Sequence, residues 1–282
     1  MYSEVLFNDP SEKDLNARFS NLKQEDFENN KKSPEINLFL GILYFNGFEK
    51  YEISKDIDKS IGFYKAAWHD NISDAGYALS KIYHNGIGVS KDSAKAKYYL
   101  EESAESGYIR SQKLLAKAYW GQDLQGLYVK NIDKAVYWFK ESANQGDSES
   151  ALILSRLYLN DEEVDKDLDE SFKWVEKGLH AKYDTSGIAP YIAAEYYEKG
   201  WGVDKNLVLA YKYYDLSGTA GSKGKSRVSK NMSDAEIEEA IKQSRAWQAV
   251  QTFLRSFHCD DKFTIKKLHD IKRYSDTFYF RA

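Results

Sequence analysis

Small and aromatic residues recur along the chain with the spacing of helix faces. A pattern that occurs five times begins with a small residue, has an aromatic three positions later and another small residue seven positions after the start. Positions three or four and seven apart lie on one face of an α-helix, so each copy predicts a helix with a narrow stripe for close packing. The five copies are residues 60–71, 96–107, 135–146, 171–182 and 210–221.

Each copy is preceded by a residue that favours the start of a helix. An Asp or Asn stands four positions before the first small residue, and such side chains accept hydrogen bonds from the free amides of a first helical turn. We therefore predict N-caps at Asp56, Asp92, Asn131, Asp167 and Asn206.

A second helix is predicted before each of these, and its marker is a tyrosine. A small residue stands three positions before the tyrosine, and in repeats one, two and five Gly47, Gly86 or Gly200 follows it after three, where a left-handed residue can end the helix. The marker tyrosines are Tyr44, Tyr83, Tyr119, Tyr158 and Tyr197. The chain therefore consists of helical pairs repeated every 36 to 39 residues.

The segment LSKIYHNGIGVSKDSAKAKYYLEESAESG (79–107) resembles the Sel-one-like repeat, a relative of the tetratricopeptide repeat with the pattern L-G-x-x-Y-x-x-G-x-G-V followed by D-x-x-K-A-x-x-W-[YF]-x-x-A-A-x-x-G. Repeats two and five carry this pattern best. The resemblance implies an all-α fold: a right-handed α-solenoid of about five helix-turn-helix repeats, with a capping helix and a C-terminal extension.

We divide the chain accordingly. A leader or cap at 1–33 precedes the repeat array 34–221, and a linker at 222–232 leads to a closing helix at 233–257, which opens with Ser233 and Glu236 as a capping box. Residues 258–282 form an extension outside the repeat pattern. The repeats are 36–71, 72–108, 109–147, 148–186 and 187–221.

Composition limits the classes of partner. The net charge of -4, from 40 basic and 44 acidic residues, provides no overall field for nucleic acid or an anionic membrane. The single cysteine, Cys259, excludes an intramolecular disulfide framework, and the start lacks the pattern of a signal peptide. We expect a cytoplasmic protein without a membrane span. Nucleic-acid binding by the tail is disfavoured by acids interleaved among its basic residues, which are Lys266, Lys267, Lys272 and Arg273.

Three apparent chemical motifs fail on inspection. GTAGSKGKS (218–226) ends like a phosphate-binding loop, but Thr219 stands where the first glycine is needed and no strand precedes it. The stretch 165–176 has acids at calcium-loop positions but Glu170 in place of the required glycine. His258 and Cys259 have no third partner for nucleophilic catalysis. We expect no metal, no cofactor and no enzymatic activity.

A candidate binding surface lies on the first helix of each pair, which lines the inner surface of such solenoids. Positions six and two before the marker tyrosine and one after it fall on one stripe. In repeats two to five this candidate stripe comprises Tyr77, Lys81, His84, Lys113, Lys117, Trp120, Leu152, Arg156, Leu159, Tyr191, Glu195 and Glu198, and repeat one contributes Leu38, Ile42 and Phe45. Lys81, Lys117 and Arg156 occupy one position in successive repeats, a ladder that suits an acidic partner surface with aromatic neighbours.

The leading hypothesis is a non-enzymatic solenoid that binds a partner protein in its concave groove. The resemblance implies an adaptor or regulator of a signalling or secretion complex, or a bacterial immunity protein that neutralises a cognate toxin or secreted effector. The rival hypothesis is a hydrolase or nucleotide-binding regulator that uses Lys225 and Ser226, or His258 and Cys259. The sequence leaves the oligomeric state open.

Overall fold

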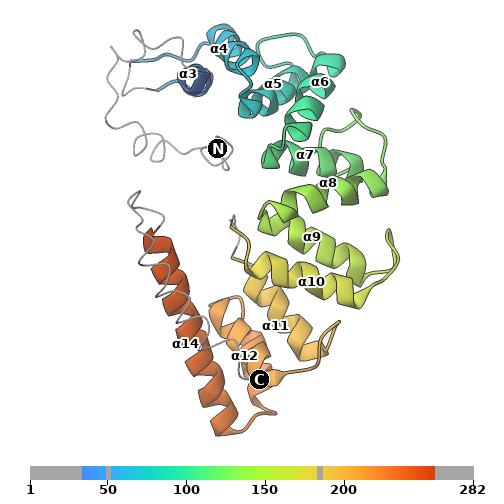
Figure 1. Cartoon of the computed structure of the whole chain (residues 1–282), viewed down its shortest axis with the longest axis vertical. Helices are drawn as coiled ribbons and strands as arrows, with labels where there is room; N and C mark the ends of the chain where they lie inside the picture. Colours follow the sequence, from blue (N-terminus) through green and yellow to red (C-terminus); the bar gives the residue numbers. More distant parts are fainter. Residues whose placement is uncertain (1–33, 49–51, 183–186, 258–282) are drawn as a thin grey trace. The chain divides into compact units, whose positions relative to one another are not determined.

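The chain is all-helical in the part that the structure describes. The structure, a computed structural model, describes residues 34–48, 52–182 and 187–257, and within them it has twelve α-helices and no β-strand (Figure 1). Only an isolated bridge joins Phe48 and Ile53. The helices are α3 (Pro34–Asn46), α4 (Ile57–His69), α5 (Ser73–Asn85), α6 (Ser93–Glu105), α7 (Ile109–Trp120), α8 (Ile132–Asn144), α9 (Ser148–Leu159), α10 (Leu168–Leu179), α11 (Ala189–Lys199), α12 (Leu207–Leu216), α13 (Ser222–Ser229) and α14 (Asp234–Phe257).

The described residues fall into two compact units. The first runs to Ala189 and includes 201–203, and the second comprises Pro190–Gly200 and the residues from Asp204 onward. The expected leader at 1–33 and extension at 258–282, with His258, Cys259 and the basic residues of the tail, lie outside the described residues.

Side-chain caps start the second helix of every repeat, as predicted. Asp56, Asp92, Asn131, Asp167 and Asn206 each have extended backbone, and each side chain accepts a hydrogen bond from the amide three residues later. These bonds are 2.9 to 3.0 Å long. Because each cap satisfies an amide that the helix itself leaves free, the register of the repeat is set locally.

The first helices of repeats one, two and five end on the predicted glycines. Gly47, Gly86 and Gly200 have φ of 78°, 71° and 72°, a conformation that side chains with a Cβ rarely adopt. Repeat three ends differently, because α7 stops one residue earlier at Gly121, with φ 83°. Repeat four has no left-handed residue there, since Asn160 is extended.

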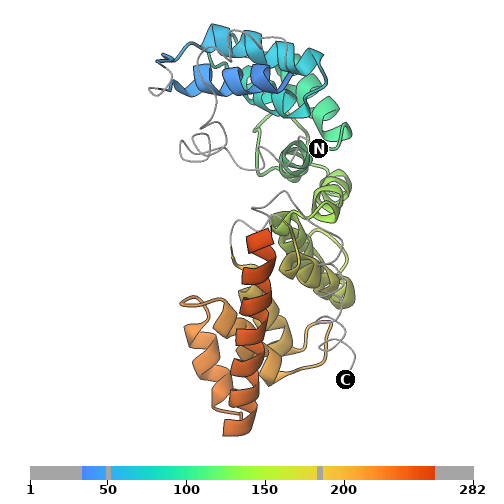
Figure 2. The same ribbon diagram turned by 60° about the vertical axis from the view of Figure 1, so that its left-hand side comes forward.

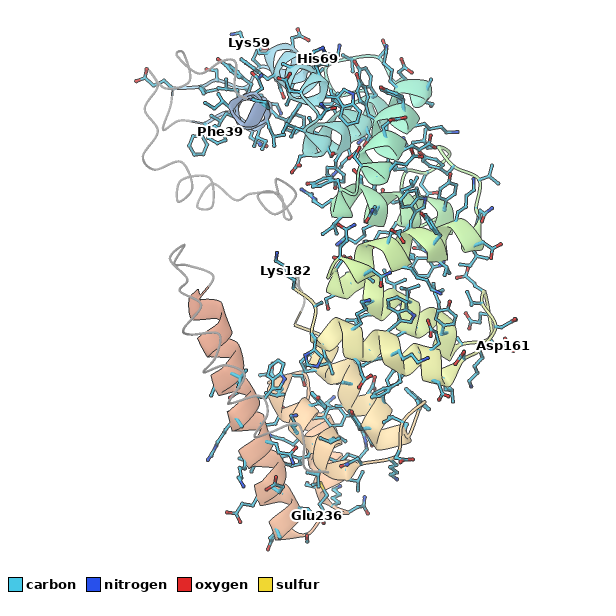
Figure 3. All side chains as sticks on the ribbon, viewed as in Figure 1. Phe39, Lys59, His69, Asp161, Lys182 and Glu236 are labelled. Carbon is cyan, nitrogen blue, oxygen red and sulfur yellow. The ribbon has the colours of Figure 1, made fainter. Side chains whose placement is uncertain are left out.

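Within the first unit, α3 to α10 form four successive pairs, and each pair packs on the next (Figure 1). Asp161, before α10, lies in the loop within a repeat, and Lys182, after α10, lies in the connection to the next repeat (Figure 3). The two kinds of loop therefore emerge at opposite ends of the helices.

Small residues allow the two helices of a repeat to approach closely. Ser60, Ala96, Ala135, Ser171 and Ala210, at the start of the repeated pattern, are all fully buried. The Ser60 hydroxyl donates to the carbonyl of Gly41 at 2.7 Å, and the Ser171 hydroxyl donates to that of Ser155 at 2.5 Å. A larger side chain at these positions would separate the backbones.

Three marker tyrosines stack on the aromatic residue that stands three positions after the start of the repeated pattern in the second helix. Ring centroids lie 5.5 Å apart for Tyr44 and Phe63, 5.8 Å for Tyr83 and Tyr99, and 5.7 Å for Tyr197 and Tyr213, with planes within 11°. These stacked pairs add specific geometry to apolar burial, so they align the two helices of repeats one, two and five.

In the second unit, residues that were expected to form a linker form a helix instead. Ser222–Ser229 is helix α13, and α12 packs against both α13 and α14 (Figure 2). The prediction of a linker at 222–232 was wrong for these residues because a lone apolar residue, Val228, gives no helical periodicity, whereas tertiary packing buries it.

The closing helix starts with the predicted capping box. The amide of Ser233 donates to Glu236 at 2.7 Å, and the amide of Glu236 lies 3.4 Å from the Ser233 hydroxyl. Two free amides at the start of α14 are thereby satisfied reciprocally.

Candidate partner-binding face of the first helices

The first unit contains a groove of about 1520 Å³ between its first helices. Its wall is formed mainly by α3, α5, the start of α7 and the loop that follows α3, with Tyr64 of α4 and Ile87 after α5. Apolar side chains line much of it. Of those in the candidate stripe, Phe45 is half-buried, whereas Leu38 and Ile42 are 7% and 8% exposed and belong to the core. The groove combines concavity with apolar and aromatic side chains and a few charged groups, a combination typical of binding sites.

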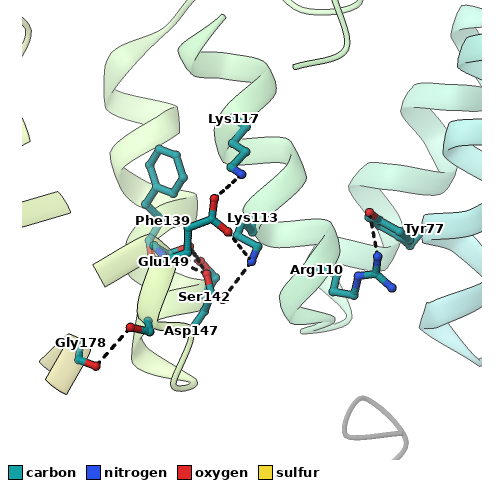
Figure 4. A network of polar contacts seen from close by, with 11 residues as sticks. Tyr77, Arg110, Lys113, Lys117, Phe139, Ser142, Asp147, Glu149 and Gly178 are labelled. Atoms are coloured by element: carbon teal, nitrogen blue, oxygen red, sulfur yellow. Dashed lines mark hydrogen bonds and ion pairs between the residues drawn. The ribbon is translucent and has the colours of Figure 1, made fainter. Parts of the chain in front are cut away.

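Charged and aromatic side chains meet where α5 and α7 face the groove. The guanidinium of Arg110 lies 4.3 Å from the ring centroid of Tyr77, and its Nη2 donates to the Tyr77 hydroxyl at 3.2 Å (Figure 4). The ammonium of Lys81 lies 5.4 Å from the same centroid. Arg110 and Lys81, from two successive repeats, therefore both form cation–π contacts with the ring of Tyr77.

Asp74 is the buried acid of this groove. It is 5% exposed, and its Oδ1 has no hydrogen-bond partner in the described part of the chain. Burial raises the pKa of Asp74 to about 6, although a hydrogen bond from Tyr108 and the charge of Arg110 lower it. The carboxylate thus changes its charge close to neutral pH.

At the next repeat interface, between α7 and α9, carboxylates of the chain itself pair with the lysines of α7. Lys113 donates to Asp147 and to Glu149, each at 3.0 Å, and Lys117 donates to Glu149 at 2.5 Å (Figure 4). Burial lowers the pKa of Lys113, but the charges of Asp147 and Glu149 outweigh it and raise that pKa overall. Burial raises the pKa of Glu149, and hydrogen bonds from Lys117 and Lys113 outweigh it and lower that pKa.

Asp147 has a second role in this ionic cluster. It caps α9 by accepting from the amide of Ser150 at 3.0 Å and from the Ser150 hydroxyl at 2.6 Å, and its side chain is 1% exposed. The cap orients the carboxylate toward Lys113, so a local helix-start signal also holds two repeats together.

Trp120 and Arg156 form a third cluster on the face. The Arg156 guanidinium lies 5.4 Å from the Trp120 ring centroid, and the Trp120 Nε1 donates to Glu163 at 2.5 Å. Lys130 also pairs with Glu163. Hydrogen bonds from Lys130 and Trp120 lower the pKa of Glu163. Arg156 is exposed and Trp120 is half-buried, so both have surface available to a partner.

The structure separates the remaining stripe residues. Leu152 is 7% exposed and packs where Gly178 lacks a side chain, so it belongs to the core. His84 and Leu159 are half-buried in the first unit, and Tyr191 and Glu195 are half-buried in the second.

Glu198, in the second unit, is also buried. It accepts two hydrogen bonds from Arg227 at 2.6 Å and one from the Tyr214 hydroxyl at 2.6 Å. The hydrogen bonds from Arg227 lower the pKa of Glu198 to about 2. Leu152 and Glu198 therefore lie on the predicted face but are buried by other parts of the fold, because the i, i+4, i+7 rule marks a face and not what packs on that face.

The segment that imitates a phosphate loop has a packing role. Lys225 donates to Asp215 at 2.7 Å, and a Cβ on Gly224 would lie 2.4 Å from the Tyr214 ring. The missing side chain of Gly224 permits α13 to approach α12. In the calcium-like stretch, Asp167 is the cap of α10, and no cluster of metal-ligating side chains occurs among the described residues.

Sequence reasoning missed the partners of the stripe cations. Asp147 and Glu149 pair with lysines of the candidate stripe, and Glu163 accepts a hydrogen bond from Trp120, from 32 to 43 positions away. A signal did exist for one of them: Glu149 aligns with Arg110 and Asp74 when the repeats are superposed, so a charged residue recurs at the second position of α5, α7 and α9.

Comparison with known families identifies the repeat. The sequence profile of the Sel1 repeat matches residues 36–67, 73–108, 109–147, 148–181 and 189–222. The predicted number of repeats, five, is thus confirmed. Among curated proteins, no match to this chain was found.

Three solved structures are similar to the chain, and the first of them supports the shared fold. A crystal structure of a Sel1 repeat protein from Oxalobacter formigenes is similar with a TM-score of 0.59 and 19% identity, over 77% of this chain and 89% of that one. Protein c5321, a protective antigen with an SLR fold from uropathogenic Escherichia coli, gives 0.43 and 18%, over 86% and 60%. A Sel1 repeat protein from Klebsiella pneumoniae gives 0.41 and 16%, over 74% and 100%. No helix in the described residues is both long and apolar enough to cross a membrane.

Proposed function

Because the chain belongs to the Sel1 repeat family, whose members generally mediate protein–protein interaction, we propose that it binds a partner protein through its first helices and catalyses no reaction. The observation that carries this proposal is the groove of about 1520 Å³ in the first unit. The half-buried Phe45, Ile53 and Tyr77 in its lining offer the apolar and aromatic surface that dominates protein interfaces.

The binding site comprises this groove and the exposed stripe residues beside it. Lys81 lies in the groove itself, and Trp120 with Arg156 forms an aromatic and arginine pair, the residue types that most often dominate binding energy. Lys117 contributes less to recognition of an acidic partner, because Glu149 already neutralises it. Nucleic acid and membranes are not partners in this proposal, because the net charge of -4 disfavours both.

We assign the protein to the cytoplasm, since one cysteine suits a reducing compartment. There it acts as an immunity protein that neutralises a toxin or effector, or as an adaptor in a signalling or secretion complex. A growth assay separates these roles. An immunity protein restores the growth of cells that produce the recovered partner, whereas an adaptor leaves growth unchanged and links the partner to a third protein.

Quantitative co-purification from native extract tests the site. Ala78 lines the groove on α5, and the variant Ala78→Arg fills it with a long side chain. Ala94→Arg makes the same change at an exposed position of α6 and is the matched control. We expect the partner to be recovered by the wild type and by Ala94→Arg and to be lost from Ala78→Arg.

Two outcomes would overturn this function. If Ala78→Arg retains the partner as well as Ala94→Arg does, the groove is not the site. If no specific protein is recovered and the purified chain turns over a small molecule instead, the chain is an enzyme.

A further inference from the structure

Two neighbouring repeat interfaces use one register position with opposite charge. Glu149, the second residue of α9, lies against α7 and receives Lys113 and Lys117. Arg110 is the second residue of α7, and it lies against α5. The repeat spacing makes Tyr77 and Lys81 the equivalents of Lys113 and Lys117. One interface supplies a carboxylate to two lysines, whereas the other supplies a guanidinium to Tyr77 (Figure 4). Lys81 lies over the ring of the same tyrosine.

Within the described residues, the groove therefore keeps two lysines that no carboxylate neutralises. Lys81 forms no ion pair with a carboxylate in the described part of the chain, and neither does Lys55 on the groove rim. Instead, their ammonium groups lie over the rings of Tyr77 and Phe45, at 5.4 and 5.8 Å. An ammonium held over an aromatic ring remains able to accept a carboxylate from another molecule.

Acids in the groove do not cancel this charge. Glu52 is exposed on the rim and forms no ion pair in the described residues. Asp74 is buried beside Arg110 and Tyr108, and its charge acts on that arginine. Among the described residues, neither acid of the lining forms an ion pair with Lys55 or Lys81.

We propose that the groove binds an acidic segment of the partner protein, in which a carboxylate pairs with Lys81 as Glu149 pairs with Lys117, and a neighbouring large apolar side chain rests on the half-buried Phe45 and Ile53. This inference rests on the proposed protein-binding function and adds the chemistry of the bound segment. The partner would then supply the carboxylate that Glu149 supplies at the next repeat interface, since this interface has Arg110 at that position instead.

The lining favours a polypeptide over a free anion or a lipid headgroup. A phosphate ion reaches the lysines but gains nothing from the apolar wall, which supplies most of the contact area of a tight complex. A peptide that carries an acid next to an apolar residue contacts both the lysines and the apolar wall of the groove.

Selection from a random dodecapeptide library displayed on phage tests this chemistry, with the full chain as bait. We expect enriched peptides to share an Asp or Glu next to Leu, Ile or Phe. Binding of one such synthetic peptide is then measured by fluorescence anisotropy against a second peptide with the acid replaced by its amide. The amide peptide should bind at least tenfold more weakly, and the difference should shrink at high salt.

Charge reversal of the chain gives the matched controls. Lys81→Glu should weaken the acidic peptide at least tenfold, and a peptide with Lys at that position should recover binding to Lys81→Glu. Lys65→Glu makes the same change at an exposed position of α4 away from the groove and should leave affinity within twofold. Circular dichroism of each variant verifies that the fold is intact.

Several results would refute the inference. These are a selection that enriches no peptide or no acidic residue, equal binding of the acid and amide peptides, and equal affinity of Lys81→Glu and Lys65→Glu. Inorganic phosphate or anionic lipid vesicles that bind with the same sensitivity to Lys81→Glu would assign the site to a different ligand class. If Ala78→Arg loses the native partner while Lys81→Glu retains it, the protein-binding function stands and only the acidic segment fails.

Discussion

Removing the cation of Lys113 should destabilise the first unit far more than removing that of Lys117. Both lysines pair with Glu149, but Lys113 alone also pairs with Asp147. The Lys113 and Asp147 side chains are 17% and 1% exposed, whereas those of Lys117 and Glu149 are 27% and 41% exposed. The perturbation is Lys113→Met, with Lys117→Met as the matched control, because methionine keeps most of the apolar stem in each case.

The magnitude follows from what each variant leaves behind. Two charges 3 Å apart attract by roughly 5 kcal/mol at an effective dielectric constant of about 20, and desolvation offsets much of this. In Lys113→Met, Asp147 stays buried without a cation, although its bonds to Ser150 remain, so we expect a loss of about 2 to 3 kcal/mol. In Lys117→Met, Glu149 keeps Lys113, and the expected loss is about 0.5 kcal/mol.

Urea unfolding followed by helical circular dichroism at pH 7 measures both losses. The lower exposure of the Lys113 pair also implies that 1 M NaCl removes the effect of Lys117→Met but leaves most of that of Lys113→Met. Equal losses for the two variants would refute the reasoning, since they would mean that burial of Asp147 does not govern the energy of this cluster. A loss for Lys113→Met below about 0.5 kcal/mol would do the same.

Three further outcomes are expected. Arg227 holds the pKa of Glu198 at about 2, so this carboxylate stabilises the second unit above its unfolded pKa near 4.5, and the stabilisation disappears as the pH falls toward 2. In urea unfolding, Glu198→Gln should lower the free energy of unfolding by about 1 to 2 kcal/mol at pH 7 and by little at pH 2. Burial raises the pKa of Asp74 to about 6, so ionisation of this side chain destabilises the fold as the pH rises through 6. Asp74→Asn should raise the urea midpoint at pH 8 and leave it unchanged at pH 3.5, and a lower midpoint at pH 8 would contradict this. A Cβ on Gly76 would lie 2.5 Å from a Trp68 ring atom, whereas one on Gly62 would meet nothing within 4 Å; Gly76→Ala should lower the thermal midpoint by an amount equivalent to about 1 to 3 kcal/mol, and Gly62→Ala should not lower it.

The helices could be predicted because their signals are local. The cap at Asp92 and the glycine that ends α5 act within a few residues of their own position, so a sequence pattern contains all the partners involved. Recurrence strengthened each signal, since the same offset in five copies outweighs an exception such as the loop of repeat three.

Helix α13 shows where such signals stop. Its sequence, SKGKSRVS, contains one glycine and a single apolar residue, Val228, so it has the pattern of a basic linker. Gly224 lies against the Tyr214 ring, and Lys225 pairs with Asp215 of α12. These contacts come from another helix, and they stabilise a segment whose own propensity is low.

The candidate site divides in the same way. The repeat register identified Lys81, Lys117 and Arg156 as equivalent positions, and the structure gives them different surroundings. Lys117 pairs with Glu149, Arg156 lies over Trp120, and Lys81 lies over Tyr77 beside a second cation. Equivalent positions in a repeat thus share a face but not a partner.

The sequence determines which residues start, end and line each helix of this Sel1 repeat protein, because capping, left-handed glycines and helical periodicity depend on neighbours within a few positions. Which charges remain available to another molecule is decided only by the tertiary structure. Lys117 meets Glu149 from 32 residues away because two helices pack at one separation and rotation, and a change in either would break the pair. The physical reason is that an ion pair requires contact within a few ångströms, and long-range packing sets that distance.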